Sequence, residues 1–293
     1  LTKELLFRKP QDRPSPHRIL ECLKVADNAP EARKTSSHFT QTMPFVGRYE
    51  ELKFIRKAYD DSRKDTVILF LDAESGMGKS EVASHFLREL SVEDPHVVSF
   101  FGRCYERESV PFKAFDGVAD ELSRFLVKLS GEESAALMPR RANFLARLFP
   151  VLSRVKAIRN APYEKVDHLD PHVVRKWMFD CFRDILQKIA DHKPLILFID
   201  DFQWADRDSR IMMEELMHPP DAPKVLLLCT VRTEGLKDID FNTVAGAEAD
   251  VRSLTVPSLN EKDEKELVEI LGLSLKAEQK KAILRESYGH PLF

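Results

Sequence analysis

Short, continuous apolar runs recur through the middle of the chain and predict buried β-strands. They cover residues 67–72, 97–101, 195–199 and 225–231. A continuous apolar run indicates a strand that is covered on both faces, because a strand with one solvated face alternates apolar and polar positions. Buried strands separated by helical segments are typical of a parallel sheet between two layers of helices. The pattern therefore predicts a three-layer α/β fold.

Apolar residues at helical spacing mark the segments between and after these strands. Helices are predicted at 79–90, 112–129, 141–155, 172–190, 261–271 and 277–286. The last two follow Pro257 and are expected to begin a helical lid domain beside the α/β core. Residues 26–43 contain Pro30 and several serines and threonines, which is the composition of a linker.

The loop after the first predicted strand carries the first functional motif. It reads Ala73-Glu-Ser-Gly-Met-Gly-Lys79-Ser80 and leads into a predicted helix. It matches the phosphate-loop pattern Gly-x-x-x-x-Gly-Lys-Ser/Thr, in which backbone N–H groups and a helix N-terminus bind phosphates. Alanine replaces the first glycine and is expected to cost the loop some freedom of φ without abolishing binding. The predicted nucleotide-binding residues of this loop are Gly76, Met77, Gly78, Lys79, Ser80 and Glu81.

The same motif predicts ATP and Mg²⁺ as ligands. Lys79 is expected to reach the β- and γ-phosphates, and the hydroxyl of Ser80 to bind the metal ion. Two carboxylates, Asp200 and Asp201, end the third predicted strand. Because the carboxyl ends of parallel strands meet at one edge of the sheet, we expect this acid pair beside the phosphate loop. Asp200 is predicted to be a Mg²⁺ ligand with Ser80, and Asp201 to act as the general base for the attacking water.

Five separated motifs together resemble the STAND branch of AAA+-related ATPases, which are signalling NTPases of bacterial regulators, innate-immune receptors and some bacterial serine/threonine kinases. They are Phe45-Val-Gly-Arg48-Tyr-Glu50, the phosphate loop, Asp200 with Asp201-Phe-Gln-Trp-Ala-Asp206, Cys229-Thr-Val-Arg232 and Gly289-His-Pro291-Leu-Phe293. The resemblance implies that Val46, Arg48 and Pro291 lie at the adenine. It also implies that Arg232 is a catalytic sensor that contacts the γ-phosphate.

Two further stretches resemble parts of related proteins. Gly102-Arg-Cys-Tyr-Glu106 is similar to a segment of kinase- and cyclase-linked members, in which Arg103 or Glu106 either faces the γ-phosphate or forms a solvated strand end. The segment 5–15 resembles the last helices of a protein-kinase C-lobe. The resemblance implies a bacterial kinase–ATPase fusion of which this chain carries only the end of the kinase.

These observations predict the organisation of the chain. The expected parts are a kinase remnant at 1–25, a linker at 26–43, an ATPase core at 44–256 and the start of the lid at 257–293.

Composition narrows the class of protein. Of the 293 residues 43% are hydrophobic and 32% are charged, which is typical of a soluble folded protein. The net charge of −3 gives no electrostatic case for nucleic acid as a partner. No apolar run approaches the roughly 18 residues that span a bilayer. Four scattered cysteines without a Cys-x-x-Cys pair favour a reduced, cytoplasmic protein.

The leading hypothesis is an ATP-driven switch with slow hydrolysis, which binds ATP or ADP and acts through protein partners or self-association. One alternative is a DNA-binding ATPase of the origin-recognition or helicase-loader type, which predicts a basic surface. Another is a scaffold that holds ADP permanently and never turns over.

Overall fold

The computed structural model describes residues 44–106, 110–163, 169–236, 249–271 and 275–291. All of them belong to one compact unit, Met43–Phe293. The predicted kinase remnant at 1–25 and linker at 26–43 therefore lie outside the described residues and remain predictions.

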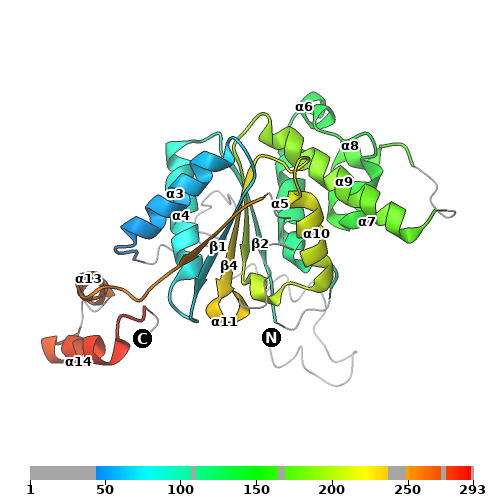
Figure 1. Ribbon diagram of the computed structural model, residues 1–293. Coiled ribbons are helices and arrows are strands. Elements are labelled where there is room, and N and C mark those ends of the chain that lie inside the picture. Colours follow the sequence, from blue (N-terminus) through cyan, green and yellow to red (C-terminus); the bar gives the residue numbers. More distant parts are fainter. Residues whose placement is uncertain (1–43, 107–109, 164–168, 237–248, 272–274, 292–293) are drawn as a thin grey trace, which may run out of the picture. The chain divides into compact units, whose positions relative to one another are not determined.

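Five strands form one parallel sheet at the centre of this unit (Figure 1). They are β1 (Val67–Ala73), β2 (Val98–Arg103), β3 (Leu195–Asp200), β4 (Val225–Arg232) and β5 (Asp250–Thr255), in the order β2-β3-β4-β1-β5. Every residue of β1 and β3 is buried. Strand β4 lies between β1 and β3, so that the phosphate loop and the acid pair leave the sheet on either side of β4.

Helices cover both faces of the sheet, which confirms the three-layer α/β fold. Helices α3 (Tyr49–Ser62) and α4 (Lys79–Glu93) pack on one face, and α5 (Lys113–Lys128), α9 (Pro171–Ala190) and α10 (Arg207–Met217) lie on the other (Figure 1). The right-handed crossover rule explains this division. The chain crosses the sheet in one direction through α4, from β1 to the edge strand β2, and returns through α5, α9 and α10 in the opposite direction.

The segment between β2 and β3 contains the one clear error in the predicted helices. The predicted helix at 141–155 is wrong, because α7 (Asn143–Leu148) ends before Pro150 and a 3-10 helix follows at Pro150–Arg154. Proline has no N–H for the helix ladder and forces the preceding residue into an extended conformation. Phe149 has φ −129° and ψ 103°. Short helices α6 (Gly131–Ala136) and α8 (Lys156–Arg159) complete this segment.

Strand β5 has no counterpart among the predicted strands. It is an edge strand that pairs only with β1, and its residues are exposed or partly buried. A strand of this kind carries charged positions such as Asp250 and Arg252 in place of a continuous apolar run. Helices α3 and α10 were likewise not predicted, whereas the helices expected at 79–90, 112–129 and 172–190 match α4, α5 and α9 to within three residues.

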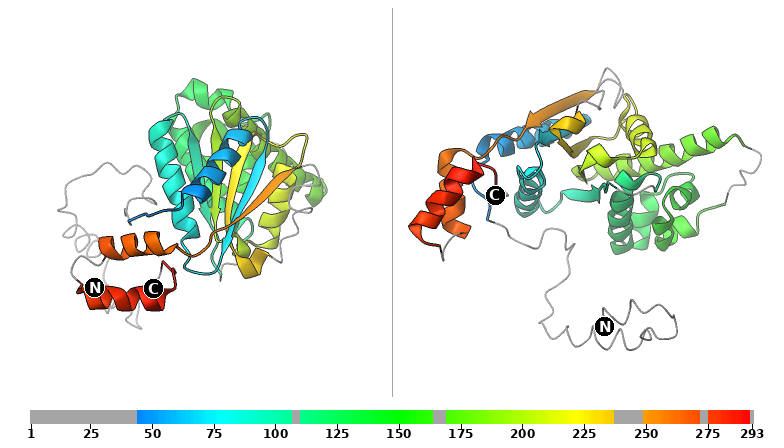
Figure 2. Two further views of the ribbon diagram at one scale, coloured as in Figure 1. Left: turned by 60° about the vertical axis from the view of Figure 1, so that its left-hand side comes forward. Right: turned by 90° about the horizontal axis from the view of Figure 1, so that it is seen from below.

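Beyond β5 the chain forms the two helices predicted for the lid. Helix α13 (Glu261–Leu271) and helix α14 (Ala277–Ser287) lie side by side (Figure 2). The turn after α14 returns to the residues before α13, because the Leu259 N–H donates to the carbonyl of Gly289 at 2.8 Å. Gly289 has φ +76°, where a Cβ would also meet the Leu259 carbonyl at 2.5 Å.

Candidate functional site

The phosphate loop links the end of β1 to the start of α4. Gly76 and Gly78 have φ of 83° and 86°, a region that residues with a side chain rarely adopt. Ala73, by contrast, is the buried last residue of the extended strand β1. Its position requires no glycine, which explains why the loop forms with alanine at the first position of the motif.

The ammonium of Lys79 lies inside this loop. Its Nζ donates to the carbonyls of Ala73 and Glu74, at 3.0 and 2.9 Å, and the side chain is buried. Burial lowers its pKa and the nearby carboxylates of Asp201 and Asp200 oppose that shift. The ammonium has three N–H donors, and these contacts use two of them. Two backbone carbonyls thus hold the ammonium inside the loop, where a phosphate site requires a cation.

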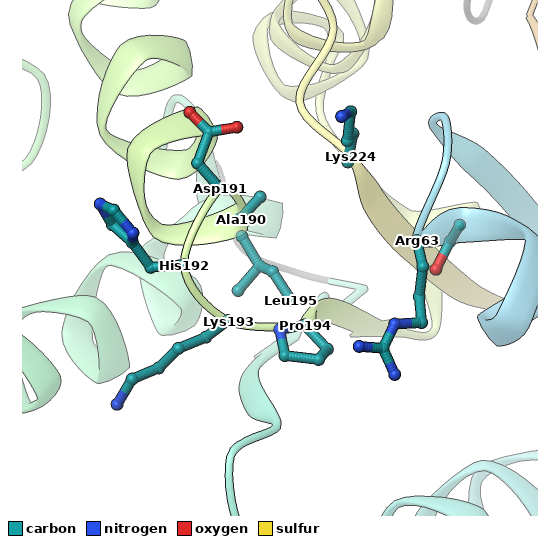
Figure 3. A pocket seen from close by; sticks show the side chains of 9 residues that line it. Arg63, Ala190, Asp191, His192, Lys193, Pro194, Leu195 and Lys224 are labelled. Atoms are coloured by element: carbon teal, nitrogen blue, oxygen red, sulfur yellow. The ribbon is translucent and has the colours of Figure 1, made fainter.

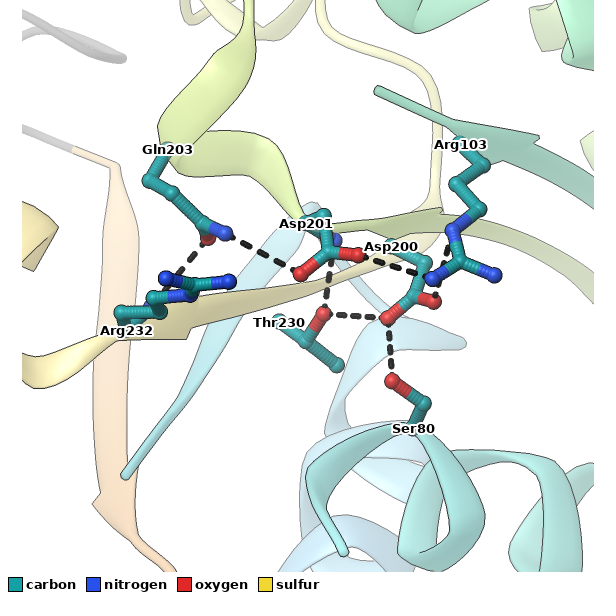
Figure 4. Close-up of polar contacts among 7 residues, drawn as sticks. All are labelled: Ser80, Arg103, Asp200, Asp201, Gln203, Thr230 and Arg232. Atoms are coloured by element: carbon teal, nitrogen blue, oxygen red, sulfur yellow. Dashed lines mark hydrogen bonds and ion pairs between the residues drawn. The ribbon is translucent and has the colours of Figure 1, made fainter. Parts of the chain in front are cut away.

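Asp200 is the centre of the polar cluster at the carboxyl edge of the sheet (Figure 4). Its Oδ1 accepts hydrogen bonds from the hydroxyls of Ser80 and Thr230, both at 2.6 Å, and its side chain is buried. Carboxylate and hydroxyl oxygens are ligands that suit Mg²⁺, which usually takes one or two protein groups together with water and phosphate oxygens. The pair Ser80 and Asp200, predicted from the sequence to share a metal ion, is therefore adjacent and has fitting chemistry.

Asp201 has both carboxylate oxygens engaged by neighbouring side chains (Figure 4). Oδ1 accepts a hydrogen bond from Nε2 of Gln203 at 3.0 Å, and Oδ2 accepts one from Nη2 of Arg103 at 3.1 Å. Its backbone N–H donates to Oγ1 of Thr230 at 2.9 Å. Asp201 has φ 58°, a left-handed conformation that aspartate adopts more readily than most residues. Thr230 therefore orients both members of the acid pair.

Arg103 belongs to this cluster, although the sequence left its place open. Its Nε lies 3.6 Å from Oδ2 of Asp200, in addition to the contact with Asp201. Burial lowers the pKa of the guanidinium, and the two carboxylates raise it by more. Glu106, the other candidate in that stretch, is exposed.

Arg232 ends β4 next to the phosphate loop. It is the register partner of Ala73 on β1, and its charge contributes to the lowered pKa of Lys79. The guanidinium carbon lies 5.8 Å from the centre of the Trp204 ring, and the backbone N–H donates to Oε1 of Gln203 at 3.1 Å. Gln203 therefore bridges the second acid and the predicted sensor arginine.

A pocket beside the phosphate loop brings together the residues that the sequence assigns to adenine. The segment before α3, the phosphate loop and the lid all contribute to it. Its lining consists of Pro44, Phe45, Val46, Arg48, Met77, Gly78, Glu81, Val82, Leu259, Leu267 and Pro291. A mostly apolar concave surface with a few polar groups suits a flat heteroaromatic ring.

Arg48 connects the three walls of this pocket. Its buried guanidinium donates to the carbonyl of Pro257 at 2.6 Å, to that of Met77 at 3.2 Å and to Oε1 of Glu51 at 3.0 Å. A second contact joins the lid to the loop, because Nε2 of His290 lies 2.8 Å from the carbonyl of Ser75. Arg48 thus lines the pocket, and its donors hold protein carbonyls and a carboxylate.

Asp206 explains the end of the motif that follows the acid pair. Its carboxylate accepts hydrogen bonds from the backbone and hydroxyl of Ser209, at the start of α10, and from the backbone N–H groups of Phe112 and Lys113, at the start of α5. Burial raises its pKa, but these hydrogen bonds lower it by more. One carboxylate therefore caps two helices and fixes the end of the loop after β2.

The sequence did not assign roles to Thr230, Gln203 or Asp206, and it left Arg103 undecided. Thr230 and Gln203 each lie inside a quoted motif, two positions from a predicted catalytic residue, and this position is the signal that could have identified them. Asp206 stands immediately before the helix α10, and an aspartate at that position is a helix N-cap signal.

A second pocket lies at the opposite edge of the sheet, where β3 and β4 begin (Figure 3). Its lining includes Arg63, Asp191, His192, Lys193 and Lys224. Helices α3 and α9 end beside it, and the negative ends of helix dipoles are stabilised by such cations. The basic residues are explained by the helix ends, and we assign this pocket no ligand. Within the described part of the chain, no helix is long and apolar enough to cross a membrane.

A phosphate loop between a buried strand and a helix, with an acid pair from a second strand at its hydroxyl, defines the class of P-loop nucleoside triphosphatases. Residues 44–228 match the AAA ATPase domain family, and this range is more than half of the chain. The chain therefore belongs to the AAA ATPase domain family. No curated protein sequence matches it significantly.

Several solved structures are similar to the chain at low sequence identity. A STAND protein with a tetratricopeptide repeat sensor from Pyrococcus horikoshii is 19% identical, with a TM-score of 0.44 over 84% of this chain and 28% of that one. The Walker-type ATPase of Pyrococcus abyssi is 15% identical, with a TM-score of 0.48 over 86% and 66%. The Aeropyrum pernix ORC1 protein, solved in complex with DNA, is 11% identical, with a TM-score of 0.49 over 86% and 58%. The chain thus spans less than two thirds of each.

Proposed function

We propose that this chain is an ATP-driven switch domain of a larger signalling protein, which binds Mg-ATP between the α/β core and the lid and hydrolyses it slowly. The observation that carries the proposal is the pocket in which the segment before α3, the phosphate loop and the lid meet. Adenine fits its apolar lining, and the loop next to it supplies backbone donors and Lys79 for the phosphates.

In this proposal the residues at the carboxyl edge divide the chemistry between them. Ser80 and Asp200 hold Mg²⁺, and the bound ion neutralises charge that develops on the phosphate oxygens. Asp201 accepts a proton from the attacking water. Arg232 contacts the terminal phosphate from the end of β4.

The attachment of the lid supports a switch. Arg48 donates to carbonyls of Met77 in the phosphate loop and Pro257 at the start of the lid, and His290 of the lid contacts Ser75 of the loop. A ligand shifts a conformational equilibrium only through contacts that differ between the two states. In this proposal, the contacts between the phosphate loop and the lid are the ones that differ between the ATP-bound and ADP-bound states. The signalling role, the partners or self-association, the bacterial origin and the preceding serine/threonine kinase domain follow from the sequence resemblance alone.

Thermal unfolding and phosphate release test the proposal. Mg-ATP at about one hundred times its Kd raises the Tm by about 5–10 °C. Lys79→Ala removes most of that rise, whereas Lys64→Ala, at an exposed lysine outside the site, keeps it. An equal rise in Lys79→Ala would remove Lys79 from the site. Nucleotide binding without any release of phosphate would favour the ADP-holding scaffold, and salt-dependent binding of duplex DNA would favour the origin-recognition alternative.

A further inference from the structure

Arg103 approaches the acid pair from a third strand, and the backbone fixes where it does so. On β2 it is the register partner of Asp200 on β3. The Cys104 N–H donates to the Asp200 carbonyl at 3.0 Å, which continues the ladder past the strand end. The guanidinium reaches Oδ2 of Asp200 at 3.6 Å and Oδ2 of Asp201 at 3.1 Å. Arg103 therefore forms ion pairs with both carboxylates.

The two oxygens of Asp200 face different partners. Oδ1 accepts a hydrogen bond from Ser80 of the phosphate loop, and Oδ2 lies toward Arg103 (Figure 4). A divalent cation held by Ser80 and Asp200 brings two positive charges to a carboxylate that already has a cationic partner. Bound cations dominate the local charge of such sites. The metal ion therefore weakens the attraction between the Arg103 guanidinium and Asp200. A terminal phosphate is an anion that the guanidinium can bind with two hydrogen bonds.

The side chain of Arg103 has room for that exchange. It is 47% exposed, while the side chain of Asp200 is 4% exposed. The guanidinium carbon lies 5.6 Å from the centre of the Tyr105 ring, which is itself exposed. A movement of the arginine therefore breaks its two ion pairs and leaves the apolar core intact.

We propose that Arg103 is a specificity residue for the γ-phosphate: it forms ion pairs with both acids before nucleotide binds and transfers its guanidinium to the terminal phosphate of Mg-ATP. ADP lacks the terminal phosphate and leaves Arg103 on the acid pair. The inference rests on the proposed ATP-binding function and adds a second arginine to the recognition of ATP.

Titration calorimetry with Mg-ATP and Mg-ADP tests the inference on wild type, Arg103→Ala and Arg103→Gln. At saturating Mg²⁺, the lost charge-assisted hydrogen bonds lower ATP affinity by about 10–150-fold in both variants, while ADP affinity is unchanged. Arg103→Gln keeps most of the aliphatic part of the side chain, and it replaces the alanine variant in the comparison if that variant folds poorly. Arg56→Ala is the matched control, because it removes a surface ion pair with Glu93 and leaves both affinities unchanged.

The outcomes separate this inference from the proposed function. An equal loss of ATP and ADP affinity in Arg103→Ala would show that Arg103 only maintains the shape of the site. No loss would show that its ion pairs do not contribute to nucleotide binding. Wild-type protein that binds neither nucleotide would overturn the proposed function and the inference with it.

A second readout distinguishes the exchange from a merely structural role. Without Arg103, Asp200 loses one cation that competes with the metal, so Mg²⁺ supports ADP binding at lower concentration in Arg103→Ala than in wild type. A site that had lost its shape would need more Mg²⁺, and that result would contradict the exchange.

Discussion

The hydroxyl of Ser80 lies 2.6 Å from Oδ1 of Asp200, although 120 positions of the chain separate the two residues. The contact joins the first turn of α4 to the end of β3, across the intervening strand β4. Thr230 of β4 donates to the same oxygen at 2.6 Å. One carboxylate oxygen of the acid pair is therefore hydrogen-bonded to both the phosphate loop and the strand that carries the predicted sensor arginine.

Asp200→Asn is expected to abolish the Mg²⁺ dependence of nucleotide binding. The amide cannot offer the metal a negative charge, although it keeps the shape of the side chain. Calorimetric titration of ATP with Mg²⁺ and with a chelator measures the difference between the two affinities. Thr230→Val is the matched variant, because it keeps the charge of Asp200 and removes the hydrogen bonds of the threonine hydroxyl to Asp200 and to the Asp201 N–H. Asp200→Asn protein with the Mg²⁺ dependence of wild type would exclude Asp200 as a ligand.

Asp201→Asn is expected to lower the rate of phosphate release by about 10²–10⁴-fold, the usual contribution of a general base. Affinity for Mg-ATP does not fall, because the proposed metal ligand Asp200 is intact. The asparagine also binds Arg103 less strongly than the aspartate does, so that the arginine is easier to move to the phosphate. Steady-state phosphate release measures the first quantity and calorimetry the second. Asp208→Asn is the control. It removes a carboxylate of α10 that pairs with Arg175 of α9, and it is expected to leave the rate unchanged. A wild-type rate in Asp201→Asn would place the base elsewhere.

The phosphate loop and the acid pair were predictable because their chemistry is local. Lys79, Ser80, Asp200 and Asp201 each stand beside an apolar strand that the sequence also reveals. The contacts of Arg103 were not predictable, because they depend on the register between β2 and β3. No local pattern sets that register.

Other features were hidden for different physical reasons. Strand β5 is an edge strand, so packing does not require a continuous apolar run. The apolar spacing at 141–155 continues through Pro150, and the missing N–H of proline outweighs that spacing. The sequence placed Arg48 at the nucleotide, and its burial against Pro257, Met77 and Glu51 became visible only in three dimensions.

Arg48→Ala is expected to destabilise the unit by about 3–5 kcal/mol, the usual cost of removing one partner of a buried ion pair. The side chains of Arg48 and Glu51 are only 5% and 12% exposed, and two carbonyls also lose their donor. Arg56→Ala breaks a surface pair and is expected to cost about 0–1 kcal/mol. Urea unfolding at equilibrium measures both. Comparable free energies for the two variants would show that Arg48 does not tie the pocket together.

Arg232→Ala is expected to bind ADP normally and to lose the preference for ATP. The residue ends β4 opposite Ala73, where the phosphate loop begins, and its charge acts on Lys79. The lost charge-assisted hydrogen bond lowers ATP affinity relative to ADP by about 10–150-fold. Trp204→Ala, which removes the ring beneath the guanidinium but keeps its charge, is expected to have a smaller effect.

The double variant Arg232→Ala, Arg103→Ala decides whether the two arginines contact the terminal phosphate independently. They approach from β4 and β2, on opposite sides of β3, and Gln203 and Asp201 lie between them in the chain of hydrogen bonds. Independent contacts give losses of ATP affinity that multiply, whereas groups that act through one network give a smaller combined loss. Titration of ATP and ADP against all four proteins measures the coupling. An unchanged ratio of ATP to ADP affinity in Arg232→Ala would leave Arg103 as the residue that distinguishes the nucleotides.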